Sequence, residues 1–429
     1  MNIKNTSTPL PTRAWAVFWC VSIFYFYELV LRMTPSVMTS DLMAAFKVNS
    51  TELGVLSSFY YYGYTPLQIP CGILVDRMGV RMTVVISCLL CVTGGLLFGM
   101  AESLALAQLG RFLIGAGSAC AFISTLKVVA DWFPTSYFVV LTGVANAMGT
   151  LGGTFGGSPL AIMVDNFGWR DSMTYLSLAG ILVTLAAYFV IKDHPESSGK
   201  KQDRSTTNEI GILDSLKRLA TSKQTWLISI FGCLTYLPIS AFCELWAVPY
   251  ISTVFHVETS LAAFGGTMIF LGMAFGGIAF AWFSDKIQSR KKAMMLAALL
   301  TALMFLALIF IPGLELWHAL VILLIAGFMS GGEILSFAGT KEINPIEISG
   351  TTLGFTNMVI MLGGIIFQPL LGKLIDLSWD GATDTNMVPI YSESAYQNAI
   401  LAVPVCLCLA FIIASTLRES FPKAGRVNK

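Results

Sequence analysis

The feature that most limits the fold of this chain is a series of apolar runs, each close to the length of a membrane-spanning helix. Twelve are present, at about 14–38, 52–75, 82–101, 104–130, 136–164, 171–191, 224–254, 261–284, 292–312, 315–339, 349–374 and 395–417. A helix needs about 20 mainly apolar residues to cross a bilayer. Only 12% of the 429 residues are charged, whereas a soluble domain carries about 25%. The sequence therefore predicts an all-α membrane protein with twelve transmembrane helices in a lipid bilayer.

A polar segment divides these runs into two sets of six. Residues 192–223 hold seven basic and five acidic side chains among Ser, Thr, Gly and Gln. Such a composition cannot bury a core, so we expect a tether in which the stretch ILDSLKRLA forms an amphipathic helix on the membrane. The predicted units are a six-helix bundle at 1–191, this central loop, and a second six-helix bundle with a tail at 224–429.

The distribution of basic residues predicts the orientation. Of the 26 lysines and arginines, 20 lie in the two chain ends and the turns on their side, three lie on the other side, and three lie within the runs. Cytoplasmic loops are rich in Lys and Arg. Both termini and the central loop are therefore predicted to be cytoplasmic.

The two sets of runs also repeat one another. GVANAMGTLGGTFGGSP in the fifth run and GFTNMVIMLGGIIFQP in the eleventh share the spacing Gly-x-x-Asn-x5-Gly-Gly at an offset of 211 residues, with Asn146 matching Asn357. The turns after the second and eighth runs match at an offset of 209, Asp76 to Asp285. Such offsets predict two pseudo-symmetric bundles that arose by duplication.

The turn after the second run carries a specific motif. It reads Gly72-Ile-Leu-Val-Asp76-Arg77-Met-Gly79-Val-Arg81 and fits G-x3-D-[RK]-x-G-x-[RK]. With this motif, the whole chain resembles the major facilitator superfamily, which carries the motif between helices 2 and 3. The resemblance implies a conformational latch, in which Gly72 permits close helix packing and Asp76 caps a helix or pairs with a basic residue across the half-interface. A turn that only caps two helices is the alternative. The predicted latch residues are Gly72, Asp76, Arg77, Gly79, Arg81, Asp285 and Lys286.

Six charged residues interrupt the apolar runs: Glu28, Arg32, Arg111, Lys127, Glu244 and Glu333. A charge at the bilayer centre costs about 2.5–3.5 kcal/mol on insertion scales, so such groups face water or each other. They lie in runs 1, 4, 7 and 10, and the resemblance implies that these four helices line a central cavity. Glu28 and Arg32 share one helix face at i, i+4. We expect Glu28 to pair with Arg32, Arg111 or both, and these three residues are the proton-coupling candidates.

Other polar side chains are candidates for the substrate cavity. Four tyrosines stand mid-run in SSFYYYGYTPLQIP, and a tyrosine in the middle of the membrane usually needs a hydrogen-bond partner. Consecutive residues cannot all face one cavity. The predicted cavity residues are Tyr61, Tyr62, Tyr64, Lys127, Asn146, Glu244, Trp246, Glu333 and Asn357. An interfacial position is the alternative for Lys127 and Glu333.

Enzymatic chemistry is not indicated by the motifs. The glycine-rich GGTFGGS has no G-K-[ST] after it, and the three histidines lie far apart, so neither a phosphate loop nor a metal site is predicted. No cofactor and no nucleic-acid partner are expected. The sequence predicts a secondary transporter, a functional monomer that moves a small-molecule substrate by alternating access with proton symport. Glu28 is the expected proton carrier, and uniport is the alternative.

The substrate is predicted from the balance of the six charges, three basic and three acidic. This balance favours a zwitterion such as an amino acid. FYFYELVLRMTPSV, SSFYYYGYTPLQIP and GRFLIGAGSACAF resemble the Pht-type transporters of intracellular bacterial pathogens, which implies amino-acid or nucleoside import and a place in the bacterial inner membrane. The alternatives are an organic-anion, nucleoside or siderophore transporter of the same superfamily, or a membrane sensor that does not transport.

Overall fold

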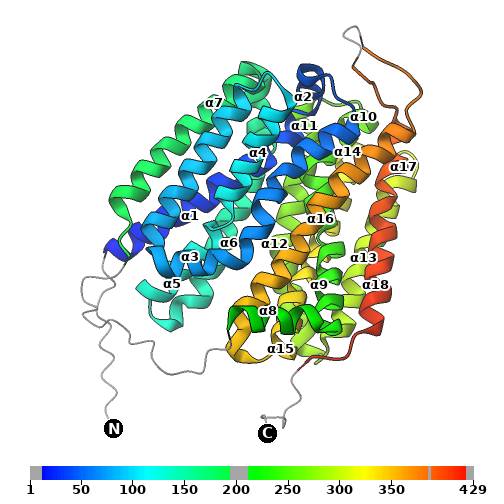
Figure 1. Cartoon of the computed structure of the whole chain (residues 1–429). Helices are drawn as coiled ribbons and strands as arrows, with labels where there is room; N and C mark the ends of the chain where they lie inside the picture. The colour runs from blue at the N-terminus through cyan, green and yellow to red at the C-terminus, as the bar shows by residue number, and fades with distance from the viewer. Residues whose placement is uncertain (1–11, 194–210, 385–387, 422–429) are drawn as a thin grey trace, which may run out of the picture.

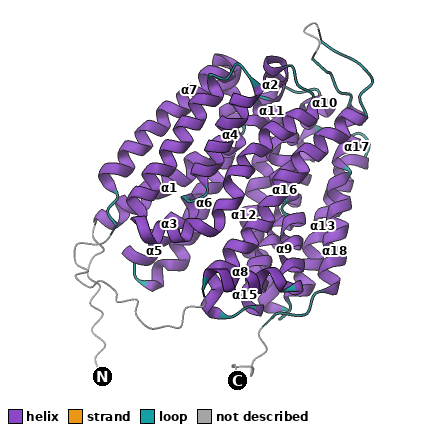
Figure 2. Cartoon of the chain, viewed as in Figure 1, coloured by secondary structure: helices purple, strands orange, loops and turns teal. Residues whose placement is uncertain are grey.

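The structure is a computed structural model that describes residues 12–193, 211–384 and 388–421. Figure 2 shows that the described residues are almost all helical. Residues 194–210, most of the predicted tether, lie outside the described part.

Among the described residues, ten helical segments are long and apolar enough to cross a bilayer. They are Thr12–Val37, Ser50–Gly99, Leu104–Trp132, Val140–Val190, Lys223–Phe255, Thr259–Lys286, Arg290–Phe310, Leu316–Ile343, Ile346–Leu377 and Glu393–Thr416. Two of these hold 50 and 51 residues, which corresponds to about 75 Å of helix against a hydrocarbon core of about 30 Å. Each long segment contains a glycine with positive φ inside a helix, Gly79 (φ 80°, ψ 162°) in α3 and Gly168 (φ 76°, ψ 161°) in α7. The predicted turns at these places are therefore reduced to single residues.

The individual helices are α1 (Thr12–Met33), α2 (Thr39–Phe46), α3 (Ser50–Gly99), α4 (Leu104–Ser118), α5 (Ala121–Trp132), α6 (Phe138–Phe155), α7 (Ser158–Val190), α8 (Ile212–Thr221), α9 (Lys223–Thr235), α10 (Ala247–Phe255), α12 (Phe264–Lys286), α13 (Arg290–Phe310), α14 (Leu316–Ser330), α15 (Leu335–Ile343), α16 (Ser349–Leu377), α17 (Glu393–Ile400) and α18 (Ala402–Thr416). Figure 1 shows α1 to α7 on one side of the molecule and α9 to α18 on the other, which we call the first and second halves. One end of the molecule carries α2 and α17, and the other carries α8. We call them the α2 end and the α8 end.

Three of the spans contain a change of helix type, the first at its end and the other two within the span. A 3₁₀ turn, Thr34–Val37, follows α1; a π-helix, Pro238–Trp246, joins α9 to α10; and a 3₁₀ turn, Gly331–Ile334, joins α14 to α15. Proline lacks the N–H that an α-helix needs, and π-turns often mark functional sites. Irregular backbone at membrane depth is tolerated where protein surrounds it. These breaks lie at or next to Arg32, Glu244 and Glu333.

The paired glycines of the repeat form the contacts between the halves. A Cβ on Gly153 of α6 would lie 2.9 Å from the ring of Phe270 in α12, and one on Gly364 of α16 would lie 2.1 Å from the ring of Tyr61 in α3. Phe270 and Tyr61 are 209 residues apart, which is the offset of the motif turns. The same ring-on-glycine contact therefore joins the halves twice.

The helix predicted inside the central loop is confirmed as α8. Its Leu219 is buried with Ile348, Phe355 and Val359, and the indole N–H of Trp226 donates to the Ala220 carbonyl at 2.9 Å. α8 is therefore packed against α16 and the start of α9.

At the α2 end, a carboxylate of the second half caps a helix of the first. Asp376, at the end of α16, accepts hydrogen bonds from the backbone N–H groups of Ser50 (3.1 Å) and Thr51 (2.8 Å) at the start of α3. The Tyr391 hydroxyl donates to the same carboxylate. A carboxylate at a helix N-terminus satisfies free N–H groups and complements the helix dipole. We call Ser50, Thr51, Asp376 and Tyr391 the α2-end seal.

Candidate functional site

The end of α1 is shaped by a proline. Pro35 has no N–H to donate to the Leu31 carbonyl, four residues earlier, so that acceptor needs other donors. The Thr34 hydroxyl donates to it at 2.9 Å and Arg111 Nη1 of α4 at 3.0 Å. Arg111 Nη2 also donates to the Arg32 carbonyl at 3.4 Å. Arg111 therefore holds the backbone that carries Arg32.

Arg32 joins the two halves. Its Nη2 lies 2.7 Å from Glu244 Oε1, within the π-helix of the second half, and donates to Tyr61 Oη at 2.7 Å and Tyr236 Oη at 3.4 Å. The Met361 sulfur lies 3.7 Å from the same nitrogen. Arg32 is 5% exposed and Glu244 2%, so this is an ion pair buried between the halves.

One nitrogen atom of the Arg32 guanidinium, Nε, takes no part in these contacts. Within the described residues, Arg32 Nε is buried and has no hydrogen-bond partner, and the same holds for Arg111 Nε. Buried N–H groups normally have partners, and an unpaired one is costly. The guanidinium of Arg32 therefore presents a free donor for an anionic oxygen atom.

Tyrosine rings surround this guanidinium. The Arg32 Cζ atom lies 5.5 Å from the ring centroid of Tyr60, 5.1 Å from that of Tyr61, 5.9 Å from that of Tyr64 and 6.0 Å from that of Tyr236. A cation within about 6 Å of a ring centroid is attracted by the ring. We call these four residues the tyrosine cluster.

Two phenols connect this cluster to carboxylates. The Tyr61 hydroxyl donates to Glu244 while it accepts from Arg32. The Tyr60 hydroxyl donates to Glu28 Oε2 at 3.1 Å. Among the described residues, the ion pair of Arg32 is with Glu244 and not with Glu28. The prediction that Glu28 pairs with Arg32 or Arg111 is wrong in this structure. The i, i+4 spacing does place both side chains on one face, but Arg32 reaches across to the other half.

The predicted cavity residues separate into two groups. Tyr61, Tyr64 and Glu244 meet at Arg32, as described above. Close by, the Trp246 indole donates to the Gln368 carbonyl at 3.0 Å, and Asn357 donates to Gln68 Oε1 across the halves at 2.7 Å. Glu333 is buried in the 3₁₀ turn Gly331–Ile334, and no ion pair is present on it within the described residues.

Three predicted cavity residues lie elsewhere. Tyr62 is 45% exposed and packs against the Phe59 ring, because it projects from α3 about 100° away from Tyr61. Asn146 is exposed on α6. Lys127 pairs with Asp76 at 3.2 Å and Asp131 at 3.4 Å, so the interfacial alternative fits it.

The motif turn after the second run lies at the α8 end. Gly79 has φ 80°, and a Cβ there would lie 2.4 Å from Asp193 Oδ1. Asp193 in turn accepts from the Arg81 backbone N–H at 2.9 Å. No heavy atom lies within 4 Å of the Cβ position of Gly72, so the expected close packing at Gly72 is absent from this structure. Arg77 is exposed.

The equivalent turn in the second half is held by an arginine. Arg290 Nη1 lies 2.6 Å from Asp285, and its Nη2 lies 2.8 Å from Glu342 Oε1 of α15. Lys286 is exposed, with its ammonium 4.9 Å from the Trp282 ring centroid. The ion pair of Asp76 described above and those of Arg290 each lie within one half.

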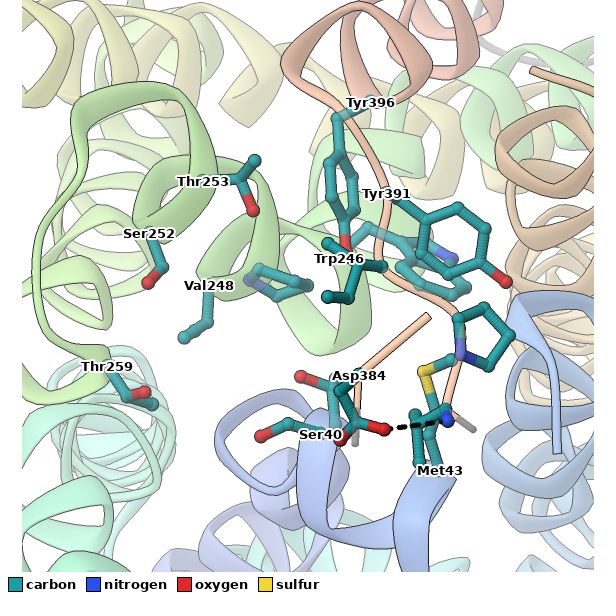
Figure 3. Close-up of a pocket in the computed structure, with 15 residues that line it drawn as sticks. Ser40, Met43, Trp246, Val248, Ser252, Thr253, Thr259, Asp384, Tyr391 and Tyr396 are labelled. Atoms are coloured by element: carbon teal, nitrogen blue, oxygen red, sulfur yellow. Dashed lines mark hydrogen bonds between the residues drawn. The ribbon is translucent and has the colours of Figure 1, made fainter. Parts of the chain in front are cut away.

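A pocket at the α2 end is separate from the buried charges. It has a volume of about 280 Å³ and is lined by α2, the π-helix with α10, and the segment before α17. Figure 3 shows Trp246 and Tyr396 at this pocket, and Asp384 accepting the Val388 backbone N–H. Arg32 and Glu244 are not among its lining residues.

Several residues of the site escaped the sequence analysis. Tyr236 and Met361 touch Arg32, and Gln68 pairs with Asn357. Tyr236 stands mid-run, so the argument used for the tyrosines of the second run would have found it. A methionine in an apolar run gives no such signal.

Comparison with known proteins completes the description. A family model described as Major Facilitator Superfamily matches residues 18–368 and 232–426. The uncharacterized transporter YybO of Bacillus subtilis (strain 168) is 25% identical over 403 residues, which are 88% of this chain and 91% of the relative. The gentisate transporter of Corynebacterium glutamicum is 25% identical, and the aligned residues are 91% of this chain and 86% of the relative. The membrane sensor protein UhpC of Escherichia coli (strain K12) is 23% identical, and the aligned residues are 93% of this chain and 91% of the relative.

Two solved structures share the fold. Both are of a bacterial homolog to the human lysosomal transporter Spinster in an inward-facing conformation, one unoccupied and one occupied. The unoccupied one has a TM-score of 0.79 at 16% identity and covers 96% of this chain and 98% of its own. The occupied one has a TM-score of 0.74 at 16% identity, with 93% and 95% covered.

Proposed function

Because the chain belongs to the major facilitator superfamily, we propose that it carries a small organic anion across a bilayer by alternating access. The family, YybO and the gentisate transporter are transporters and not enzymes, and the helices are those of an integral membrane protein. The proposal adds two statements: that the solute is an organic anion and that protons drive its transport.

The observation that carries the proposal is the free Nε of Arg32 beside an ion pair that crosses the halves. Arginine binds a carboxylate with two parallel N–H groups. A substrate carboxylate that engages Nε competes with Glu244 for the guanidinium. Its arrival therefore loosens the contact between the halves, which is what alternating access requires of a substrate.

An organic anion fits better than the zwitterion that the charge balance favours. That balance counted Lys127, which pairs with Asp76 and Asp131 at the α8 end. Without Lys127, two arginines remain against three glutamates. Glu28 and Glu333 have no cation partner among the described residues and are costly as ions, which leaves the two arginines facing the single charged carboxylate Glu244. Relatives are named as transporters of sulfoacetate, gentisate, hexuronate and glycerol-3-phosphate, and these names support an acid as the solute.

The arrangement in the membrane follows from the same proposal. The breaks at Gly79 and Gly168 divide the two long segments, so ten segments supply twelve spans in bundles at 1–191 and 224–429, joined by 192–223. The α8 end, with its basic turns, lies in the cytoplasm of a bacterial cell, in the inner membrane, and the closed α2-end seal belongs to an inward-facing state. The transporter works as a monomer, with Asp76 and its motif as the conformational latch.

Proton symport supplies the energy. Glu28 is buried and hydrogen-bonded to the Tyr60 phenol, and no cation lies within salt-bridge distance among the described residues. A buried carboxyl group without a cation is costly as the ion. Glu28 is therefore the proton-carrying group of the proposal, with Glu333 as the second candidate.

The test is counterflow and pH-driven uptake in proteoliposomes, with gentisate, gluconate, alanine and uridine as solutes. We expect an acid to move and Arg32→Gln to abolish its exchange, while Lys217→Gln on the exposed face of α8 leaves exchange unchanged. Movement of alanine or uridine alone contradicts the proposal. Binding of an acid with no flux would make the chain a sensor, the class that the name of the relative UhpC states.

A further inference from the structure

We propose that the substrate is a carboxylate on a flat aromatic body with few hydroxyl groups, and that the tyrosine cluster selects it. The inference rests on the proposed function, because it concerns the same Arg32. It concerns the body of the solute, whereas the proposed function concerns its charge.

The first argument is that the cluster presents its rings, while three of its four hydroxyl groups are already engaged. The Tyr60 hydroxyl is bound to Glu28, the Tyr61 hydroxyl lies between Arg32 and Glu244, and the Tyr236 hydroxyl accepts from Arg32. A solute at Arg32 therefore meets mainly carbon faces and edges. Its anionic group finds a donor that has no partner among the described residues, Arg32 Nε.

The second argument is that the rings form one continuous surface. Tyr60 and Tyr64 are stacked, with centroids 5.6 Å apart and planes at 20°, and Tyr60 meets Tyr61 edge-on at 5.4 Å. Aromatic rings prefer such stacked and edge-on neighbours. The ring of an aromatic acid extends this surface with the same geometry.

The third argument disfavours a polyhydroxylated acid. Each buried hydroxyl of a solute needs a hydrogen-bond partner, and an unpaired one is costly. On α3 near Arg32, the buried side-chain groups without a hydrogen-bond partner among the described residues are Ser57 Oγ, Thr65 Oγ1 and Gln68 Nε2. These few groups can serve a phenol or a carboxylate oxygen, whereas a sugar acid brings more hydroxyls, each of which both donates and accepts.

The experiment compares four probes by competition in wild-type proteoliposomes. Benzoate has one charge and an aromatic ring, cyclohexanecarboxylate has the same charge and a saturated ring, gluconate has the same charge and several hydroxyls, and alanine is the zwitterion. We expect benzoate to bind about two- to tenfold more tightly than cyclohexanecarboxylate, as one aromatic contact allows. Gluconate should be weaker than both.

Variants distinguish an effect of the tyrosine rings on the preference for benzoate from a general loss of folded protein. Tyr64→Leu should remove the preference for benzoate over cyclohexanecarboxylate, because the ratio of two affinities does not respond to a general loss of folded protein. Tyr236→Leu should do the same if Tyr64→Leu is not stable enough to purify. Tyr62→Leu is the matched control, one that changes an exposed tyrosine of the same helix, and should leave the ratio unchanged.

The outcomes distinguish the two levels of the proposal. If gluconate binds as tightly as benzoate, or if Tyr64→Leu or its substitute Tyr236→Leu keeps the wild-type ratio, the aromatic inference is overturned while an anion transporter remains. If no acid competes and alanine does, the proposed function itself fails. A benzoate preference that disappears in the ring variants supports both.

Discussion

At the scale of single residues, the pairing of Arg32 with Glu244 deserves a physical explanation. Removing two charges from water costs several kcal/mol per ion, so a buried ion pair is weak as a source of stability. Its partners here come from different halves and are both almost fully buried. The pair gains its full attraction only while the halves are closed around it, which makes it suited to report which conformation the molecule has adopted.

We expect Glu28→Gln to retain exchange of substrate and to lose accumulation driven by a pH gradient. The amide mimics the protonated carboxyl group and can still accept from Tyr60, but it carries no proton. Counterflow and pH-driven uptake in the same proteoliposomes measure the two properties. Full accumulation in this variant would assign the proton to Glu244 or Glu333, and Glu333→Gln, measured in the same way, would distinguish these two.

Gly364→Ala should destabilise the protein by about 1–3 kcal/mol, the usual cost of overpacking. The new methyl would lie 2.1 Å from the Tyr61 ring and would push the phenol away from Arg32 and Glu244. Gly350 lies in the same helix with no atom within 4 Å of its Cβ position, so Gly350→Ala should be neutral or slightly stabilising. Thermal unfolding in detergent compares them, and equal midpoints for both variants would contradict the packing.

At the scale of helices, the sequence predicted where spans exist better than how they bend. Length and apolarity predicted apolar runs that fall within the ten spanning segments of the described residues, because the bilayer imposes both properties. The π-helix at Pro238–Trp246 could not be predicted, since one proline is compatible with a kink, a 3₁₀ turn or a π-turn. That choice decides which way Glu244 points, and so the partner of Arg32 was missed. Contacts between distant segments, such as Tyr61 on Gly364, leave no local signal.

Gly79→Ala should destabilise the α8 end by about 1–2 kcal/mol, the cost of a left-handed backbone for a residue with a Cβ. The methyl would also displace the Asp193 carboxylate from the Arg81 N–H. Gly72→Ala provides the control, because its Cβ position is open in this conformation. Hydrogen exchange of the Arg81 amide should quicken in the first variant only; unchanged exchange would show that the turn tolerates alanine.

At the scale of the whole molecule, the two ends are closed by different means. The α2-end seal joins the halves through a helix cap, while the ion pairs of Lys127 and Arg290 at the α8 end join groups of the same half. The halves are thus bonded to each other at the α2 end. The repeat was visible in the sequence, but this difference between the ends was not, because Asp376 lies outside the repeated motifs.

Asp376→Asn should weaken the seal and shift the molecule toward a state open at the α2 end. A neutral amide is a poorer cap than a carboxylate, because it lacks the charge that complements the helix N-terminus. Electron-paramagnetic distances between labels on α2 and α17 should lengthen relative to wild type, while Asp380→Asn, on the exposed segment that follows α16, should not change them. Unaltered distances in Asp376→Asn would mean that the cap does not hold the halves.

The same seal should be insensitive to alkaline pH. Burial, together with the hydrogen bond to Asp376, raises the pKa of Tyr391 to about 12. A phenol with a raised pKa contributes its donated hydrogen bond below its unfolded value near 10, and that contribution is lost only as pH rises through the folded value. The label distances should therefore be constant from pH 7 to about 10, and Tyr391→Phe should lengthen them at every pH. A transition near pH 8 would argue against the buried phenol.

The two ring-on-glycine contacts have an evolutionary consequence. Tyr61 and Phe270 occupy matching places in the two halves and differ by one oxygen atom, and the residue that matches Arg32 at the same offset is Ala241. The two copies of the contact now differ: one has a phenol with a guanidinium and a carboxylate partner, and the other is hydrocarbon. The charged and phenolic groups of this protein therefore lie to one side of its axis of pseudo-symmetry. A solute that enters between the two similar halves meets these polar groups on one side and hydrocarbon groups on the other.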